Sequence, residues 1–125
     1  MITPYICVAD ARAAIDWYCR IFAGSVTVEP IVMDDGRVGH AEVRLVDGSR
    51  IMMSESFPDY GVEPPDSGRG TPVSLHLRVN DVGAVADAAK VAGATIDRGP
   101  TTDEHGTRVT LHDPFGHRWM LNDHD

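Results

Sequence analysis

The sequence predicts an α+β fold made of two βαβββ modules. Each module is expected to form a curved mixed sheet around a cleft, with its helix on the outer face. Three features of the 125-residue chain lead to this prediction: a weak internal repeat, aspartates suited to two helix starts, and apolar residues that alternate along the expected strands. The expected boundaries are a first module over 1–55, a linker over 56–72 and a second module over 73–125, together one structural domain.

The repeat is seen when the second half of the chain is written beneath the first. Residues 5–27, "YICVADARAAIDWYCRIFAGSVT", match residues 75–96, "LHLRVNDVGAVADAAKVAGATI", and "VRLVDGSRIMM" matches "VTLHDPFGHRWM". The matched positions are Val8 with Val79, Asp10 with Asp81, Gly48 with Gly116 and Met52 with Met120. Two copies of one strand–helix–strand–strand–strand unit account for this pattern.

Local chemistry supports each element of the repeated unit. A short carboxylate at Asp10 or Asp81 can accept hydrogen bonds from the free amides of a helix start, so a helix is expected after each. "DDGR" at 34–37 and "DPFG" at 113–116 are typical of turns between strands. The stretch at 56–72 is rich in proline, glycine and acidic residues, which indicates a linker.

Alternation along the strands separates an apolar face from a polar one. In "SLHLRV" the residues Leu75, Leu77 and Val79 share a face, and in the closing strand Trp119 lies opposite Met120. The apolar faces need the helices as cover. The polar faces are expected to line a sheltered cleft, the alternative being plain exposure to solvent. The polar-face residues include Tyr5, Cys7, His40, Glu42, Arg44, Met52, His76, Arg78, Arg108 and Met120.

Composition excludes several classes of function. A net charge of -8 argues against nucleic-acid binding, which requires a basic face. No apolar run approaches the roughly 18 residues of a membrane span, so no membrane partner is expected. The first residues lack the pattern of a signal peptide, and two cysteines make no disulfide framework. A cytoplasmic location is therefore the expectation.

Paired βαβββ modules with a "DPFG" turn before the last strand resemble the vicinal-oxygen-chelate superfamily, which contains glyoxalase I, extradiol dioxygenases and bleomycin-resistance proteins. The segments "GRVGHAEVRLVDGSRIMMSES" and "DPFGHRWML" look most similar to the PhnB-like branch of that superfamily. The resemblance covers nearly the whole chain. It implies a cleft lined by the sheets and a homodimer that shares strands or modules.

The resemblance also implies where a metal-dependent member would carry its ligands. One ligand of each module lies five residues before the valine of Val-x-Asp, at Thr3 and Ser74 here. The other lies four residues after the turn glycine, at Met52 and Met120. None of these suits a hard divalent cation, which prefers carboxylate or imidazole ligands. No metal and no other cofactor is therefore expected.

The expected function is non-catalytic binding of a small organic molecule in the cleft, with an aromatic or peptide-like antibiotic suggested by the resemblance. No catalytic residue is assigned. Phe57 and Tyr60, in the linker, are expected to act as a mobile aromatic lid that stacks on a planar ligand. The expected ligand-binding residues are Tyr5, His40, Glu42, Met52, Ser54, Phe57, Tyr60, Ser74, His76, Arg108 and Met120.

Two alternatives remain open at this point. The chain is a metal-dependent lyase, isomerase or dioxygenase if His40, Glu42 and His76 form a displaced metal site. It is an interaction module without catalytic activity if the cleft has lost its ligand. A structural role for His40 and Glu42, hydrogen-bonded to each other or to arginines, is favoured over catalysis.

Overall fold

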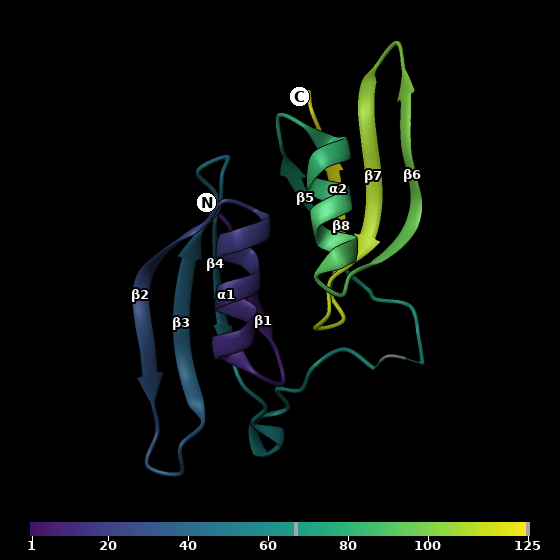
Figure 1. The fold of residues 1–125 in the computed structure, drawn as a ribbon. Helices are drawn as coiled ribbons and strands as arrows, with labels where there is room; N and C mark the ends of the chain where they lie inside the picture. The colour runs from purple at the N-terminus through teal and green to yellow at the C-terminus, as the bar shows by residue number, and fades with distance from the viewer. Residues whose placement is uncertain (67, 125) are drawn as a thin grey trace. The chain divides into compact units, whose positions relative to one another are not determined.

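The computed structural model of the protein describes residues 1–66 and 68–124. The chain divides into two compact units, Met1–Pro65 and Asp66–Asp125. Each unit contains a strand, a helix and three further strands, in the order expected of a βαβββ module (Figure 1). The finer division into 1–55, 56–72 and 73–125 stays a prediction. In residues 1–66 and 68–124, neither α-helix has the length and apolar character needed to cross a membrane.

The first unit is a mixed sheet with one helix and a short 3-10 helix. Its strands lie in the order β1-β4-β3-β2, with β1 parallel to β4 and the other neighbours antiparallel. Its elements are β1 (Tyr5–Cys7), α1 (Ala11–Ile21), β2 (Ser25–Val32), β3 (Val38–Arg44), β4 (Arg50–Ser54) and the 3-10 helix η1 (Pro58–Tyr60).

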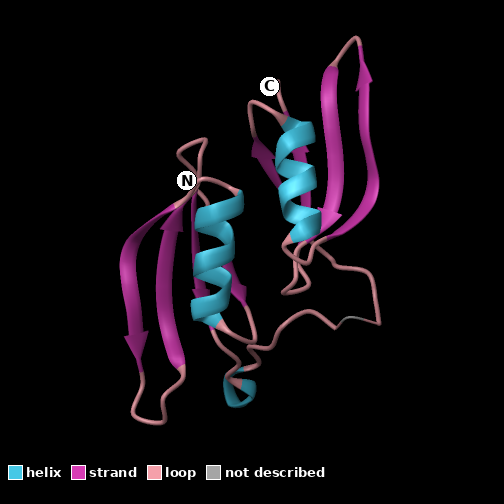
Figure 2. Ribbon diagram, in the orientation of Figure 1, coloured by secondary structure: helices cyan, strands magenta, loops and turns pink. Residues whose placement is uncertain are grey.

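The second unit repeats this arrangement, as Figure 2 shows. Its strands lie in the order β5-β8-β7-β6, and β5 is parallel to β8. Its elements are β5 (Ser74–Arg78), α2 (Val82–Val91), β6 (Thr95–Asp103), β7 (Gly106–His112) and β8 (Arg118–Asn122). The predicted α+β class with two mixed sheets is confirmed.

Both helices begin where the sequence predicts. Asp10 accepts a hydrogen bond from the Ala13 amide at 3.0 Å, and Asp81 accepts one from the Ala84 amide at 3.0 Å. A cap of this kind contributes about 1 kcal/mol to helix stability. Glu55, just after β4, accepts from the Ala11 amide at 2.9 Å, so the last strand of the unit also holds the start of α1.

One face of each sheet packs against its helix and forms the core. α1 packs on β2 and β3, and α2 packs on β6 and β7. The alternation predicted from sequence is confirmed by burial, since Trp119 and Leu121 are buried while Met120 between them is exposed. The largest fully buried side chains are Trp119, Tyr18, Phe22, Met53, Leu77, Leu111, Leu121, Val8, Val38 and Val43.

The outer strands β2 and β6 are irregular. Their pairing with β3 and β7 contains shifts of register, including one between Ile96 and Arg98. Pro30 lies within β2 and Pro100 within β6, positions that suit edge strands because proline cannot donate to a ladder. The shift in β6 makes Asp97 an extra residue between the pairs Ile96–Leu111 and Arg98–Thr110, and such bulges re-aim side chains.

The "DPFG" turn before β8 is held by a buried carboxylate. Asp113 is 4% exposed and accepts hydrogen bonds from the amides of Phe115 and His117 at 2.9 and 3.0 Å. Its second oxygen accepts from the Trp119 indole nitrogen at 2.8 Å. Gly116 has a φ of 94°, a left-handed conformation that glycine adopts without strain. The turn is thereby tied to the core of the second unit.

Asp113→Ala should lower the free energy of unfolding by about 3 kcal/mol, because it leaves the buried Trp119 N–H without its acceptor. The matched control is Asp47→Ala in the corresponding exposed turn of the first unit, where Asp47 accepts hydrogen bonds from the amide and hydroxyl of Ser49. That change should cost less than about 1 kcal/mol. Urea unfolding followed by circular dichroism measures both. Equal losses would contradict the role given to Asp113.

Candidate functional site

The candidate site residues lie mainly on the sheet faces that the helices leave uncovered. We call these the first open face, in the unit of α1, and the second open face, in the unit of α2. On the first, strand pairing places Tyr5 beside Met52 and Met52 beside Glu42. On the second, it places His76 beside Met120 and Met120 beside Thr110. The first open face holds Tyr5, Cys7, His40, Glu42, Met52 and Ser54.

Tyr5 and His40 form a hydrogen-bonded pair on the first open face. The Tyr5 hydroxyl donates to the Gly39 carbonyl at 2.8 Å and lies 2.9 Å from His40 Nδ1. The Tyr5 hydroxyl has a single proton, which it donates to the Gly39 carbonyl oxygen. In the hydrogen bond between Tyr5 and His40, His40 Nδ1–H is therefore the donor and the Tyr5 oxygen is the acceptor. In neutral His40 the remaining nitrogen, Nε2, is then an acceptor. This pairing fixes the ring that a ligand would meet.

Glu42 is held by other partners than His40. It accepts a hydrogen bond from the Thr27 hydroxyl at 2.9 Å and lies 3.8 Å from the Arg50 guanidinium. Glu42 thus forms an ion pair with an arginine, and His40 bonds Tyr5. In residues 1–66 and 68–124, no three His, Cys, Asp or Glu side chains are grouped so that they could hold a metal ion.

Cys7 and Ser54 are neighbours in the register of β1 and β4, and both are buried. Ser54 donates its hydroxyl proton to the Glu55 carbonyl at 3.1 Å. Burial raises the pKa of the Cys7 thiol, and the charges of Glu63 and Glu55 raise it further. A raised pKa means less thiolate at neutral pH, which does not favour a nucleophilic role.

The two linker aromatics occupy different surroundings. Phe57 is half-buried, pairs with Val62 in an isolated bridge and lies beneath the Arg37 guanidinium, 3.9 Å from the ring centroid. Tyr60 is 82% exposed at the end of η1. Phe57 is thus held by its own unit, while Tyr60 has the exposure that a stacking residue needs.

Met120 occupies the centre of the second open face. It is 42% exposed, between His76 on β5 and Thr110 on β7. Met52 holds the corresponding position on the first open face, between Tyr5 and Glu42, as the internal repeat predicts. Each sheet therefore presents a methionine at the same point of its last strand.

A row of polar residues crosses the second open face beside Met120. Strand pairing places Arg118 between Ser74 and His112. Arg118 donates to the Ser74 hydroxyl at 2.6 Å, and His112 Nδ1 bonds Asp97 at 2.5 Å. Of these four residues, only Ser74 is among the ligand-binding residues expected from the sequence. The alternation of residues along the two strands does place His112 and Arg118 on their polar faces, and Arg118 is one of the arginines that could pair with a carboxylate or phosphate. Asp97 has no such signal, because the bulge in β6 brings it to His112.

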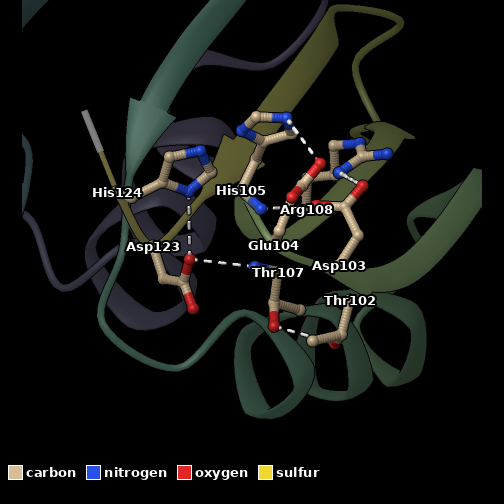
Figure 3. Close-up of polar contacts among 8 residues, drawn as sticks. All are labelled: Thr102, Asp103, Glu104, His105, Thr107, Arg108, Asp123 and His124. Carbon is tan, nitrogen blue, oxygen red and sulfur yellow. Dashed lines mark hydrogen bonds and ion pairs between the residues drawn. The ribbon is translucent and has the colours of Figure 1, made fainter.

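Arg108 lies at the other end of the second open face, near the β6–β7 hairpin. Its guanidinium donates to Asp103 at 2.8 Å (Figure 3). A backbone hydrogen bond from His105 and the Arg108 guanidinium lower the pKa of Asp103 below its ordinary value. Arg108 is thus already neutralised by a local partner, away from the row that contains Arg118.

The positions that would bear metal ligands do not fit a divalent cation. The Ser74 hydroxyl accepts a hydrogen bond from the Arg118 guanidinium, so a positive charge stands where a cation would bind. Met52 and Met120 offer only thioether sulfur, a soft ligand. Thr3 precedes β1 and has a neutral hydroxyl.

Comparison with known proteins identifies the family. Residues 2–121 match the Glyoxalase/Bleomycin resistance protein/Dioxygenase superfamily. The chain belongs to this superfamily. An uncharacterized protein of Mycobacterium bovis is 35% identical over 125 residues, covering 96% of this chain and 80% of that protein.

Solved structures of the superfamily share the fold. A PhnB protein from Bacillus cereus superposes with a TM-score of 0.74 at 19% identity and covers 97% of both chains. The fosfomycin resistance protein FosX from Listeria monocytogenes gives a TM-score of 0.75 at 12% identity, over 100% of this chain and 91% of that chain. The predicted relation to the glyoxalase, bleomycin-resistance and dioxygenase superfamily is confirmed by the family match, and the PhnB protein shares the fold. At these identities the two structures establish the fold alone.

The raised pKa of Cys7 predicts slow alkylation by iodoacetamide at neutral pH, with a rate that keeps rising above the ordinary thiol pKa. Glu63→Gln should shift this pH profile to lower pH, because it removes a negative charge that opposes the thiolate. Glu29→Gln, on the exposed edge strand β2, is the control and should leave the profile unchanged. Mass spectrometry of the Cys7 peptide gives the rates. Rapid alkylation at neutral pH would contradict this interpretation.

Proposed function

We propose that this protein binds a small, partly apolar organic molecule on the open faces of its sheets and does not transform it. The observation that carries the proposal is Met120, an exposed thioether at the centre of the sheet face opposite the buried side chains of Trp119 and Leu121. Methionine is flexible and polarizable, so it adapts to ligand surfaces, including aromatic rings. His76 and Thr110 on either side would orient the polar groups of such a ligand.

The first open face supports the same function. Met52 has the same place in the repeat, with the Tyr5 ring beside it. Tyr5 packs edge to face against His40, with 5.3 Å between ring centroids, which gives a planar ligand an aromatic surface of fixed orientation. The fixed acceptor on His40 would add one directed hydrogen bond.

Binding is favoured over metal-dependent chemistry by the side chains available. Hydroxyls and thioethers stand at the positions where the resemblance predicts metal ligands, and His40 and Glu42 are engaged elsewhere. A protein that confers resistance by binding a drug needs only a surface that is complementary to that drug. We therefore propose an aromatic or peptide-like antibiotic as the ligand class, bound in the cytoplasm away from its target.

A thermal-shift screen of planar aromatic compounds, antibiotics included, should yield a ligand that stabilises the wild-type protein. Met120→Glu should then weaken that ligand at least tenfold, because it places a carboxylate against the apolar part of the ligand. Val91→Glu is the control, since Val91 is an exposed apolar residue of the same unit at the end of α2. It should leave affinity within about twofold. If Met120→Glu binds the ligand as tightly as the wild-type protein does, the ligand does not bind beside Met120.

We also propose that the protein is a homodimer that pairs through an open sheet edge. β2 is the outermost strand of the first sheet. Several of its apolar side chains, and those just after it, are exposed: Val26, Ile31, Val32 and Met33. An unpaired edge with apolar side chains invites pairing with a second strand.

Sedimentation at micromolar concentration should give twice the mass of one chain. Ile31→Lys should shift the protein toward monomer, because charged side chains blunt an exposed edge. Val46→Lys places the same charge at an exposed position in the β3–β4 turn and should leave the dimer intact. A wild-type monomer at this concentration would contradict the proposed dimer, and an unaffected Ile31→Lys dimer would exclude this edge.

A further inference from the structure

The row beside Met120 has a surplus of hydrogen-bond donors. Arg118 carries five N–H groups, of which one is used by Ser74 Oγ at 2.6 Å. The Ser74 oxygen accepts that bond, so the hydroxyl proton of Ser74 remains available to a further acceptor. In residues 1–66 and 68–124, no ion pair joins Arg118 to a carboxylate. Two adjacent side chains thus offer donors to the same side of the sheet.

His112 completes the row on the other side of Arg118. Its Nδ1 is occupied by Asp97, and both side chains are 31% exposed. A carboxylate in this position orients the ring, which leaves Nε2 as the remaining polar atom. In the imidazolium form Nε2 is a donor. Cross-strand neighbours lie about 5 Å apart at Cβ, so one small group can reach all three residues.

The charge of this face differs from that of the whole chain. The chain carries a net charge of -8, yet the strands of the second open face carry Arg78, Arg98, Arg108 and Arg118. Arg98 lies opposite Thr110, and Arg78 lies beside Asn122. Asp97 and Asp103 on β6 offset part of this charge, and Arg108 is paired with Asp103. The four arginines still outnumber these two carboxylates, and such an excess attracts anions whatever the net charge of the protein.

We propose that Arg118, Ser74 and His112 form an oxyanion subsite, so that the ligand of this protein carries a carboxylate or phosphate group beside its apolar part. The inference rests on the proposed binding function and narrows its ligand class to anionic compounds. Arginine suits this role because its planar guanidinium can pair bidentately with two oxygens. Met120 lies two residues after Arg118, which is about 6.5 Å along the strand. An aromatic acid would place its ring on Met120 and its oxyanion on Arg118.

The test compares three probes of equal ring size: benzoate, its neutral amide benzamide, and phenyl phosphate. Isothermal titration should show that the wild-type protein binds at least one anion about tenfold more tightly than benzamide. Arg118→Gln should remove that advantage and leave benzamide affinity unchanged. Arg118→Lys, which keeps the charge but loses bidentate pairing, should retain part of it. Ser74→Ala should weaken the anion about threefold while the fold stays intact by circular dichroism.

Arg78→Gln is the matched control, since it removes the same charge from the same face at the position beside Asn122. It should change anion affinity less than twofold. If Arg78→Gln and Arg118→Gln weaken anion binding equally, the anion is held by the overall positive charge of the face, and the subsite is overturned. Equal affinity of benzoate, phenyl phosphate and benzamide would also overturn it. The order of the two anions assigns carboxylate or phosphate as the bound group, and either order supports the subsite.

Failure of this subsite is distinguishable from failure of the proposed function. If benzamide binds, and Met120→Glu abolishes that binding while Arg118→Gln has no effect on any probe, the binding function stands and the subsite is wrong. If none of the probes binds the wild-type protein at about 10 mM, the subsite is overturned. The screen of neutral aromatic compounds then decides the proposed function separately.

Discussion

A single α-helix packs on one face of each four-stranded sheet, and this one-sided packing determines where along the strands apolar and polar residues stand. Apolar side chains on the covered side, such as Leu77 and Trp119, remove surface from water and hold helix and sheet together. Side chains on the other side do not pack against that helix, although Cys7 and Ser54 at one end of the first open face are buried. They are stable there only if they are polar, adaptable or bound to something else, which is why candidate ligand-binding residues and solvated residues share one face.

Much of the fold follows from local rules that the sequence displays. Helix starts at Asp10 and Asp81, and the division of strand residues between faces, depend on residues close together in the chain. The sites depend on distant pairs. Tyr5 bonds His40 across 35 positions, and no periodicity in the sequence indicates that contact. Asp97 was missed for a different reason, because a shift of register moves it out of simple alternation.

The two halves of the repeat keep the same frame but carry different chemistry. Each has a methionine at the centre of its last strand, yet Tyr5 stands beside one and His76 beside the other. On the opposite side of each methionine, Glu42 in the first sheet corresponds to Thr110 in the second. The shared arrangement of strands and helix constrains the residues that pack against the helix. The residues on the two open faces can therefore differ between the units. One sheet carries the hydrogen-bonded pair of Tyr5 and His40, and the other carries the row of Ser74, Arg118 and His112.

The bulge in β6 has a consequence for how this protein family can change. β6 is an outer strand, so gaining or losing one residue there leaves the ladder between β7 and β8 and the buried side chains beneath it undisturbed. The same single-residue insertion or deletion would move Asp97 toward or away from His112. An insertion or deletion of one residue in this edge strand should therefore cost little stability. It would change the electrostatics of the row on the second open face while Ser74, Arg118 and His112 keep their identities.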